Sequence, residues 1–267
     1  MIRAAVTISL VPEARGGPFV FWDGLAQGCE AAASLGFDAV ELFVPAATVI
    51  ESKALRSTLD AHGLELAAVG TGAGWLLHQH SLSTSDQVRR DQARDFVRQI
   101  IDFAGQFQAP AIIGSMQGSA EGAKDEARQR LRDSVHTLGQ YAEQYTVPLL
   151  IEPLNRYETD VINTIADGLN LLEGVSNVKL LADLFHMNIE EVDLGKAIEA
   201  AGPSIGHVHF VDSNRQAVGR GHLDVAPVVK SLLNIGYDRY LSAEVLPVPD
   251  SRSAAKQTID SFRKHFR

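Results

Sequence analysis

Eight short runs of apolar and β-branched residues alternate with longer stretches of helical periodicity along the chain. Several runs are almost continuously apolar, as in the Val-Pro-Leu-Leu-Ile that precedes Glu152, which is typical of strands buried on both faces of a parallel sheet. The alternation therefore predicts repeated βα units. The expected strands are Ala4–Leu10, Ala39–Phe43, Leu64–Val69, Ala111–Gly114, Pro148–Glu152, Val178–Asp183, Ile205–Phe210 and Tyr240–Val245.

The stretches between the runs have the pattern of amphipathic helices. In three of them, apolar residues fall mostly at three- and four-residue steps among charged ones. Gly36 and Gly236 each end a helical stretch just before a strand, a place where a left-handed glycine commonly ends a helix. The three predicted helices are Asp86–Phe107, Glu126–Tyr145 and Val225–Ile235.

The length helps to separate a closed barrel from an open doubly wound sheet. The chain has 267 residues, which is close to the roughly 250 residues of a typical TIM barrel. The first strand is not followed by the Gly-x-Gly-x-x-Gly turn of a dinucleotide site. We therefore expect a single (β/α)₈ TIM-barrel domain that spans residues 1–267.

The composition is that of a folded protein with an acidic surface. Hydrophobic residues make up 45% of the chain and charged residues 21%, so there is enough apolar surface for a large core. The formal net charge of -9 would repel a phosphodiester backbone, so we expect no nucleic-acid partner.

The single cysteine and the chain's hydropathy bear on the compartment. Cys29 has no cysteine partner for an internal disulfide, and we expect it to be a buried thiol in a reducing environment. No apolar run reaches the roughly 18 residues of a membrane span, and the N-terminus has the pattern of a strand. We therefore expect a cytoplasmic protein that does not contact a membrane.

Polar residues of metal-ligand type end four successive predicted strands, namely Glu152, Asp183, His209 and Glu244. The carboxyl ends of barrel strands meet at one mouth, where the active site lies. Three buried carboxylates would repel one another there without a cation between them. Oxygen ligands with one imidazole suit Mn²⁺, Mg²⁺ or Co²⁺, and Zn²⁺ in a catalytic role stays open. We expect one divalent ion, with Mn²⁺ as the first choice.

Other polar residues near these strand ends are open to two readings. His207 lies two residues before His209 and so faces the same side of the strand, as an interior residue or as a partner of the ligand. His186 follows Asp183 by three residues, where it could hydrogen-bond a substrate oxygen or face solvent. Glu158 could likewise reach a substrate hydroxyl or be an ordinary loop glutamate.

Five stretches in the second half of the chain carry a family resemblance. They are Ile-Glu-Pro-Leu-Asn-Arg-Tyr-Glu (151–158), Ala-Asp-Leu-Phe-His-Met-Asn (182–188), His-Val-His-Phe-Val-Asp-Ser-Asn-Arg (207–215), Gly-Arg-Gly-His-Leu-Asp (219–224) and Ser-Ala-Glu (242–244). The chain resembles the sugar phosphate isomerase/epimerase group of xylose-isomerase-like TIM barrels, and most of all D-tagatose 3-epimerase and related ketose 3-epimerases.

The resemblance implies specific roles for these residues. Glu152 and Glu244 would bind the metal and also act as paired acid and base, while Asp183 and His209 would complete the metal site. The resemblance also implies substrate contacts for Glu158, His186 and Arg215.

The first half of the chain resembles the family less closely. Glu41, at the end of the second strand, lies where the family commonly places a substrate-facing residue, although it could equally be an ordinary buried strand end. Trp75, Leu76, Leu77, His78 and His80 follow the third strand and could form a wall of the pocket.

A metal with two carboxylates supports proton transfer next to a ketone. The metal stabilises the enediolate, and Glu152 and Glu244 would handle the proton on its two faces. We therefore expect a small ketose-like sugar or keto-polyol as substrate, with ketose 3-epimerisation as the leading reaction. The same residues would suit a hydroxypyruvate isomerase or a keto-inositol dehydratase.

Two other classes of protein fit the sequence less well than a sugar isomerase or epimerase does. A nuclease resembling endonuclease IV would need ligands on early strands, but three of those strands end in Leu-Val-Pro, Val-Gly-Thr and Gly-Ser-Met. A non-catalytic sugar-binding barrel would not need acid/base carboxylates beside the metal. No Gly-rich phosphate cradle follows the last two strands, which favours a non-phosphorylated substrate. By resemblance we also expect a homo-oligomer.

Overall fold

The computed structural model describes residues 1–266 and places eight parallel strands in one closed ring. The strands follow one another around the barrel in sequence order, and β1 closes the ring by pairing with β8, with Arg3 opposite Tyr240. They are β1 (Arg3–Ser9), β2 (Ala39–Phe43), β3 (Glu65–Gly70), β4 (Ala111–Ile113), β5 (Leu149–Ile151), β6 (Val178–Asp183), β7 (Ile205–His209) and β8 (Tyr240–Ala243). All eight predicted strands are confirmed, β2 and β6 with the predicted bounds.

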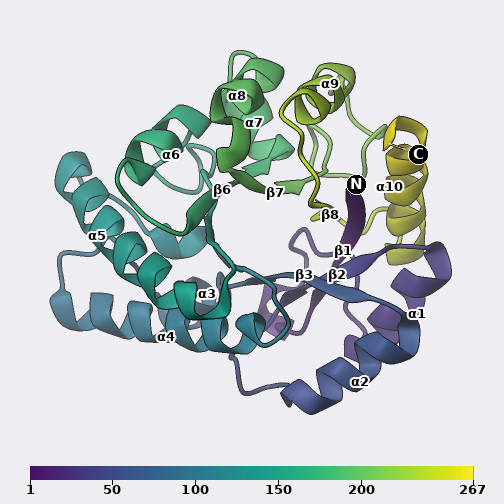
Figure 1. Ribbon diagram of the computed structural model, residues 1–267, viewed down its shortest axis with the longest axis horizontal. Helices are drawn as coiled ribbons and strands as arrows, with labels where there is room; N and C mark the ends of the chain where they lie inside the picture. Colours follow the sequence, from purple (N-terminus) through teal and green to yellow (C-terminus); the bar gives the residue numbers. More distant parts are fainter. Residues whose placement is uncertain (267) are drawn as a thin grey trace.

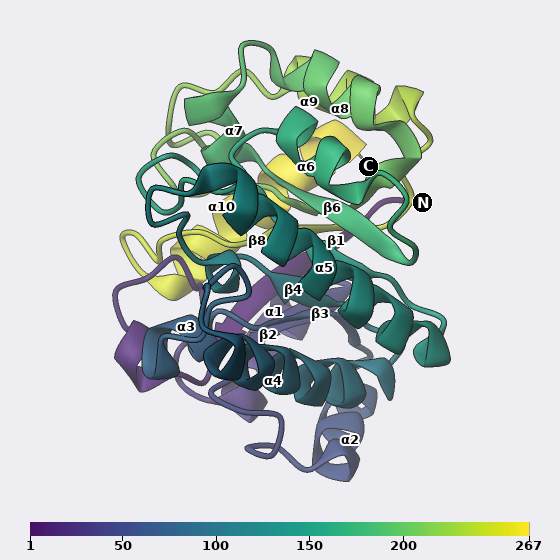
Figure 2. The same cartoon turned by 90° about the vertical axis from the view of Figure 1, so that its left-hand side faces the viewer.

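Helices surround the strand ring on the outside, and the two chain ends lie on the same side of the molecule (Figures 1 and 2). The α-helices are α1 (Leu25–Leu35), α2 (Ser52–His62), α3 (Ala73–His78), α4 (Gln87–Gly105), α5 (Lys124–Ala142), α6 (Ile165–Leu172), α7 (Leu184–Glu190), α8 (Leu194–Ala201), α9 (Ala226–Asn234) and α10 (Ser251–Phe266). Short 3₁₀ turns η1–η4 cover Pro12–Ala14, Ser115–Gln117, Glu143–Tyr145 and Gly202–Ser204.

The three predicted helices are confirmed, with ends that shift by one to three residues. The helix predicted from Asp86 begins at Gln87, because the Asp86 side chain instead accepts a hydrogen bond from the Arg89 backbone N–H and caps the helix. Gly36 ends α1 in the left-handed conformation, with φ of 84°, as expected. Gly236 follows α9 with φ of 68° and bonds back to Leu233.

Most of the hydrophobic core lies between the strand ring and the helices. The barrel interior is filled by two smaller clusters, one of Ala5, Ala39, Ala67 and Tyr240 and one of Ala68, Ile112, Leu150 and Leu181. Side chains two residues apart on a strand share a face. Polar groups such as Glu41, two residues after Ala39, therefore lie one layer nearer the carboxyl end of the barrel.

Two further expectations can be compared with the structure. Cys29 is fully buried in α1, and burial raises the pKa of its thiol to about 11, so it is an inert structural thiol. None of the helices within residues 1–266 has both the length and the apolar character needed to span a lipid bilayer.

Candidate metal centre and active-site cavity

The four predicted ligands meet at the carboxyl end of the barrel. Asp183 and His209 are the last residues of β6 and β7, while Glu152 and Glu244 each follow the last residue of β5 and β8. The Nδ1 atom of His209 lies 3.0 Å from an oxygen of Asp183, 3.4 Å from Glu152 and 3.5 Å from Glu244. Each of the four residues offers one ligand atom, and these atoms all lie within 4.8 Å of one another.

The protonation chemistry of this cluster fits a cation. Glu152 Oε1 is buried and has no hydrogen-bond partner, and burial raises the pKa of Glu152 to about 8. Burial also raises the pKa of Glu244. Burial alone would lower the pKa of His209, but the charges of Glu244 and Glu41 outweigh burial and hold it well above its usual value. This donor set of three carboxylates and an imidazole is consistent with a divalent metal site.

Arg215 lies beside the cluster and neutralises part of its charge. Its Nη2 atom donates to Glu244 Oε2 at 2.6 Å and lies 3.9 Å from Asp183 Oδ2. Its guanidinium stacks over the Phe185 ring at 4.7 Å. The side chain therefore reaches the cavity with one face on an aromatic ring and one edge on a carboxylate.

The loop that carries Arg215 is tied down by a buried carboxylate, Asp212. Its oxygens accept hydrogen bonds from the backbone N–H groups of Ser213 at 2.7 Å, Gly219 at 2.8 Å and Leu223 at 3.0 Å. Arg215 itself has a φ of 60°, which is uncommon for a residue with a Cβ. The loop therefore has a defined shape that directs Arg215 inward.

His186, in the first turn of α7, lies between two hydrogen-bond donors. Its Nδ1 atom accepts a hydrogen bond from the Asn155 backbone N–H at 3.1 Å, and its Nε2 atom lies 3.1 Å from Arg215 Nη1. Burial lowers the pKa of His186 to about 4, which keeps the ring neutral. The Nε2 atom also lies 3.8 Å from Glu152 Oε1, so this edge of the ring faces the metal cluster.

Glu158 lies at the cavity rim, and its side chain is 43% exposed. Its Oε1 atom accepts a hydrogen bond from Asn155 Nδ2 at 2.9 Å and lies 3.8 Å from Arg215 Nη1. The structure thus brings Glu158, His186 and Arg215 to the same side of the metal cluster.

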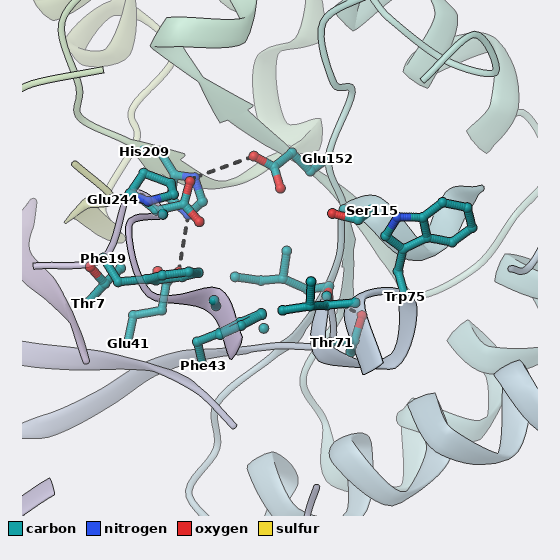
Figure 3. Close-up of a pocket in the computed structure, with 18 of the residues that line it drawn as sticks. Thr7, Phe19, Glu41, Phe43, Thr71, Trp75, Ser115, Glu152, His209 and Glu244 are labelled. Atoms are coloured by element: carbon teal, nitrogen blue, oxygen red, sulfur yellow. Dashed lines mark hydrogen bonds and ion pairs between the residues drawn. The ribbon is translucent and has the colours of Figure 1, made fainter. Parts of the chain in front are cut away.

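A cavity of about 290 Å³ opens beside the cluster and is mostly apolar on the side away from it. Phe19 and Phe43 stack there with ring centres 4.4 Å apart, and Trp75 stands at the far end (Figure 3). The hydroxyl-bearing residues on its wall are Thr7, Thr71 and Ser115. The volume is at the lower end of the roughly 300–1,000 Å³ of small-molecule sites.

The predicted wall after the third strand is partly confirmed. Trp75 and Leu76 line the cavity, whereas Leu77 packs against the hydrophobic core. The expectation is wrong for His78 and His80. His78 ends α3 and His80 follows it, and both line a separate hollow against α4.

Glu41 and His207 lie directly beneath the metal cluster. His207 Nε2 lies 2.8 Å from one Glu41 oxygen, and His209 Nε2 lies 3.2 Å from the other. The sequence separated Glu41 from these histidines by more than 160 residues, so their contact could not be seen in it.

Several residues at the site were not predicted from the sequence. Phe19 and Phe43 gave no signal, since a lone aromatic in a loop or at a strand end is common. Asn155 and Asp212 lie inside the motifs quoted above, but their hydrogen bonds to His186 and to the Arg215 loop depend on how the loops fold.

Comparison with known proteins agrees with this geometry. A family model described as a xylose isomerase-like TIM barrel matches residues 29–265. A D-psicose 3-epimerase of Ruminiclostridium cellulolyticum is 31% identical over 220 residues, which cover 78% of this chain and 74% of that protein. A 3-dehydro-D-guloside 4-epimerase of Escherichia coli is 34% identical over 122 residues, or 45% of this chain and 47% of that protein.

The likeness extends to solved structures. The crystal structure of D-psicose 3-epimerase with D-tagatose from Clostridium cellulolyticum superposes with a TM-score of 0.81 at 23% identity and covers 99% of each chain. The similarity thus includes the whole barrel. This chain belongs to the xylose isomerase-like TIM barrel family.

Proposed function

We propose that this protein is a metal-dependent ketose 3-epimerase, which inverts one carbon of a small sugar by removing and returning a proton. The observation that carries the proposal is the placement of Glu152 and Glu244 on either side of His209 Nδ1, at 3.4 Å and 3.5 Å, beside the cavity. Ketose 3-epimerases among the relatives support the choice of reaction.

The four clustered residues Glu152, Asp183, His209 and Glu244 would hold one divalent ion, Mn²⁺ in this proposal. When bound, the ion supplies a Lewis acid that polarises the ketone and the neighbouring hydroxyl of the substrate. The unpaired Glu152 Oε1 supports this assignment, because a buried oxygen without any partner is costly.

In this mechanism the two glutamates handle the proton. They follow β5 and β8, which two other strands separate around the barrel, so they approach a bound sugar from different sides. One glutamate, as a carboxylate, takes the proton from the carbon beside the ketone, and the other, as a carboxylic acid, gives a proton to the opposite face of the planar enediolate. His186 and Arg215, whose Nε2 and Nη1 atoms lie 3.1 Å apart, would hold a substrate oxygen, and Glu158 would hold a neighbouring hydroxyl.

The cavity supports a small, non-phosphorylated substrate. Its volume of about 290 Å³ suits a free sugar. Among the described residues that line it, Arg215 carries the one permanent positive charge, and Glu244 already pairs with it at 2.6 Å. A phosphate group would therefore meet no unpaired cation. D-Psicose and L-ribulose, the substrates named in relatives, are the first to test.

The test is turnover of D-psicose and L-ribulose by Mn²⁺-loaded protein in D₂O, followed by NMR of the product. We expect a 3-epimer with deuterium at the inverted carbon, because solvent-exchanging carboxylates return a solvent proton. A 3-epimer without deuterium, once internal return of the same proton is excluded, would contradict transfer by two carboxylates. Turnover of hydroxypyruvate or a keto-inositol instead would keep the site but replace the proposed reaction.

A further inference from the structure

The Glu41 carboxylate lies inside the barrel and makes contacts that metal binding alone does not explain. The residue is 4% exposed and comes from β2, on the opposite side of the ring from β6 and β7. Its Oε1 lies 3.2 Å from His209 Nε2 and its Oε2 lies 2.8 Å from His207 Nε2. Figure 3 shows Glu41 reaching from the floor of the cavity towards His209.

His209 can bind a metal only through its Nδ1 atom in this arrangement. That atom lies 3.0 Å from Asp183 Oδ2, among the clustered carboxylates, while Nε2 points the other way towards Glu41. A neutral imidazole carries one proton, and the partner of one nitrogen decides where it resides. A carboxylate beside Nε2 accepts a hydrogen bond from the Nε2–H group, which leaves the Nδ1 lone pair free for the ion.

His207 holds Glu41 in the orientation that this contact needs. Its side chain is 1% exposed, and its Nε2–H donates to the second carboxylate oxygen at 2.8 Å. Both oxygens of Glu41 are therefore engaged by imidazole N–H groups, which supports a role through His209. Glu41 also lines the cavity, and a carboxylate oxygen can accept more than one hydrogen bond, so this role stands beside the substrate contact expected from the sequence.

Glu41, His207 and His209 are also close enough to form a second cation site. Such a site would offer one carboxylate and two imidazoles and would have to use His209 Nε2. An imidazole that binds ions through both nitrogens must lose both protons, which is unfavourable near neutral pH. The distances of 2.8 Å and 3.2 Å are instead those of hydrogen bonds.

We propose that Glu41, oriented by His207, is a positioning residue that fixes the tautomer and ring orientation of His209 for metal binding. The inference rests on the metal site of the proposed function. It extends that site by one layer, from β5, β6, β7 and β8 across the barrel to β2. Partners of this kind are worth about 10–100-fold in metal affinity in other metal sites.

The experiment measures Mn²⁺ affinity and stoichiometry by calorimetry for wild type, Glu41→Gln, Glu41→Ala and His207→Gln. Glu41→Gln keeps the side-chain shape, so it preserves packing if Glu41→Ala fails to fold. We expect one ion per chain throughout, with affinity reduced about 10–100-fold at Glu41 and less at His207. Ser115→Ala is the matched control, because Ser115 lines the same cavity without touching His209 and should leave metal affinity unchanged.

A second readout reports the tautomer directly. In ¹⁵N-labelled protein loaded with diamagnetic Mg²⁺ or Zn²⁺, we expect His209 to carry its proton on Nε2 in wild type. The resonance of that nitrogen should shift in Glu41→Gln, which a merely structural role for Glu41 would not produce. Thermal unfolding in chelator verifies that each variant is folded.

The outcomes separate this inference from the proposed function. Wild type that binds no metal would overturn both. If wild type binds one ion and Glu41→Gln binds it equally tightly with an unchanged His209 resonance, the inference is wrong and the metal site stands. Two ions in wild type and one in Glu41→Gln would make Glu41 a ligand and would also overturn the inference.

Discussion

Replacing Arg215 with alanine should weaken the metal-free protein without weakening metal binding. Arg215 is the buried counterion of the cluster, since it pairs with Glu244 at 2.6 Å and lies 3.9 Å from Asp183. Its removal leaves these carboxylates without that positive charge. An added divalent ion then meets one competing cation fewer, so we expect metal affinity to stay the same or rise.

The size of the effect follows from the burial of the pair. Removing one partner of a buried ion pair costs about 3–5 kcal/mol, and we take the lower end because 14% of the Arg215 side chain remains accessible. For a domain of this size, each kcal/mol lowers the melting temperature by roughly 2–4 °C. The metal-free variant should therefore melt about 6–12 °C below wild type. Bound Mn²⁺ stabilises both folded proteins by mass action, so it should narrow the difference to the extent that the variant binds the ion more tightly.

The assay is thermal unfolding by circular dichroism in chelator and in excess Mn²⁺, together with calorimetric titration of Mn²⁺. Arg156→Ala is the matched control, because Arg156 also pairs with a glutamate through two 2.9 Å contacts, but its own side chain is 60% exposed and its partner is not one of the four proposed metal ligands. Its melting temperature should fall less, and by the same amount with and without metal. An unchanged melting temperature for metal-free Arg215→Ala, or a loss of metal affinity like that of a ligand variant, would refute this account.

Two further predictions concern pH and His186. Mn²⁺ affinity should rise between about pH 6 and pH 8. Burial raises the pKa of Glu152 to about 8, and neighbouring carboxylates raise the pKa of His209. The ion must therefore displace protons from these ligands, and this competition is stronger at lower pH. Calorimetry in two buffers of different ionisation heat should report net proton release, and affinity that is flat with pH would speak against these protonation states. His186→Ala should keep Mn²⁺ affinity within a few-fold, while turnover falls about 10²–10⁴-fold. The measurements are kcat and a calorimetric titration of Mn²⁺. Loss of the metal would instead place His186 among the ligands.

The barrel and its four clustered ligand-type residues could be predicted because both depend on local pattern. Each apolar run forms its strand largely through its own composition, and Gly36 ends its helix through its own backbone freedom. Once eight such units close in order, every strand end points to one mouth. Glu152 and Asp183 could therefore be placed together without knowledge of a single distance.

The tertiary structure decided what lies around those residues. The pairing of Glu41 with His207 joins residues 166 positions apart, and its register depends on how all intervening strands tilt and close. The aromatic wall of Phe19 and Phe43 likewise unites a loop and a strand end. Residue type alone did not show that Glu41 contacts His207 and His209.

The sequence shows some of these features and not others because the interactions behind them differ in how far apart along the chain their residues lie. Strand and helix periodicity arises from contacts between residues a few positions apart, which the sequence displays directly. The tautomer of His209, the orientation of Arg215 and the shape of the cavity arise from hydrogen bonds and packing between loops whose paths depend on the closed barrel. The sequence by itself therefore determined which residues reach the barrel mouth, and only the folded chain decided which atoms they present to one another.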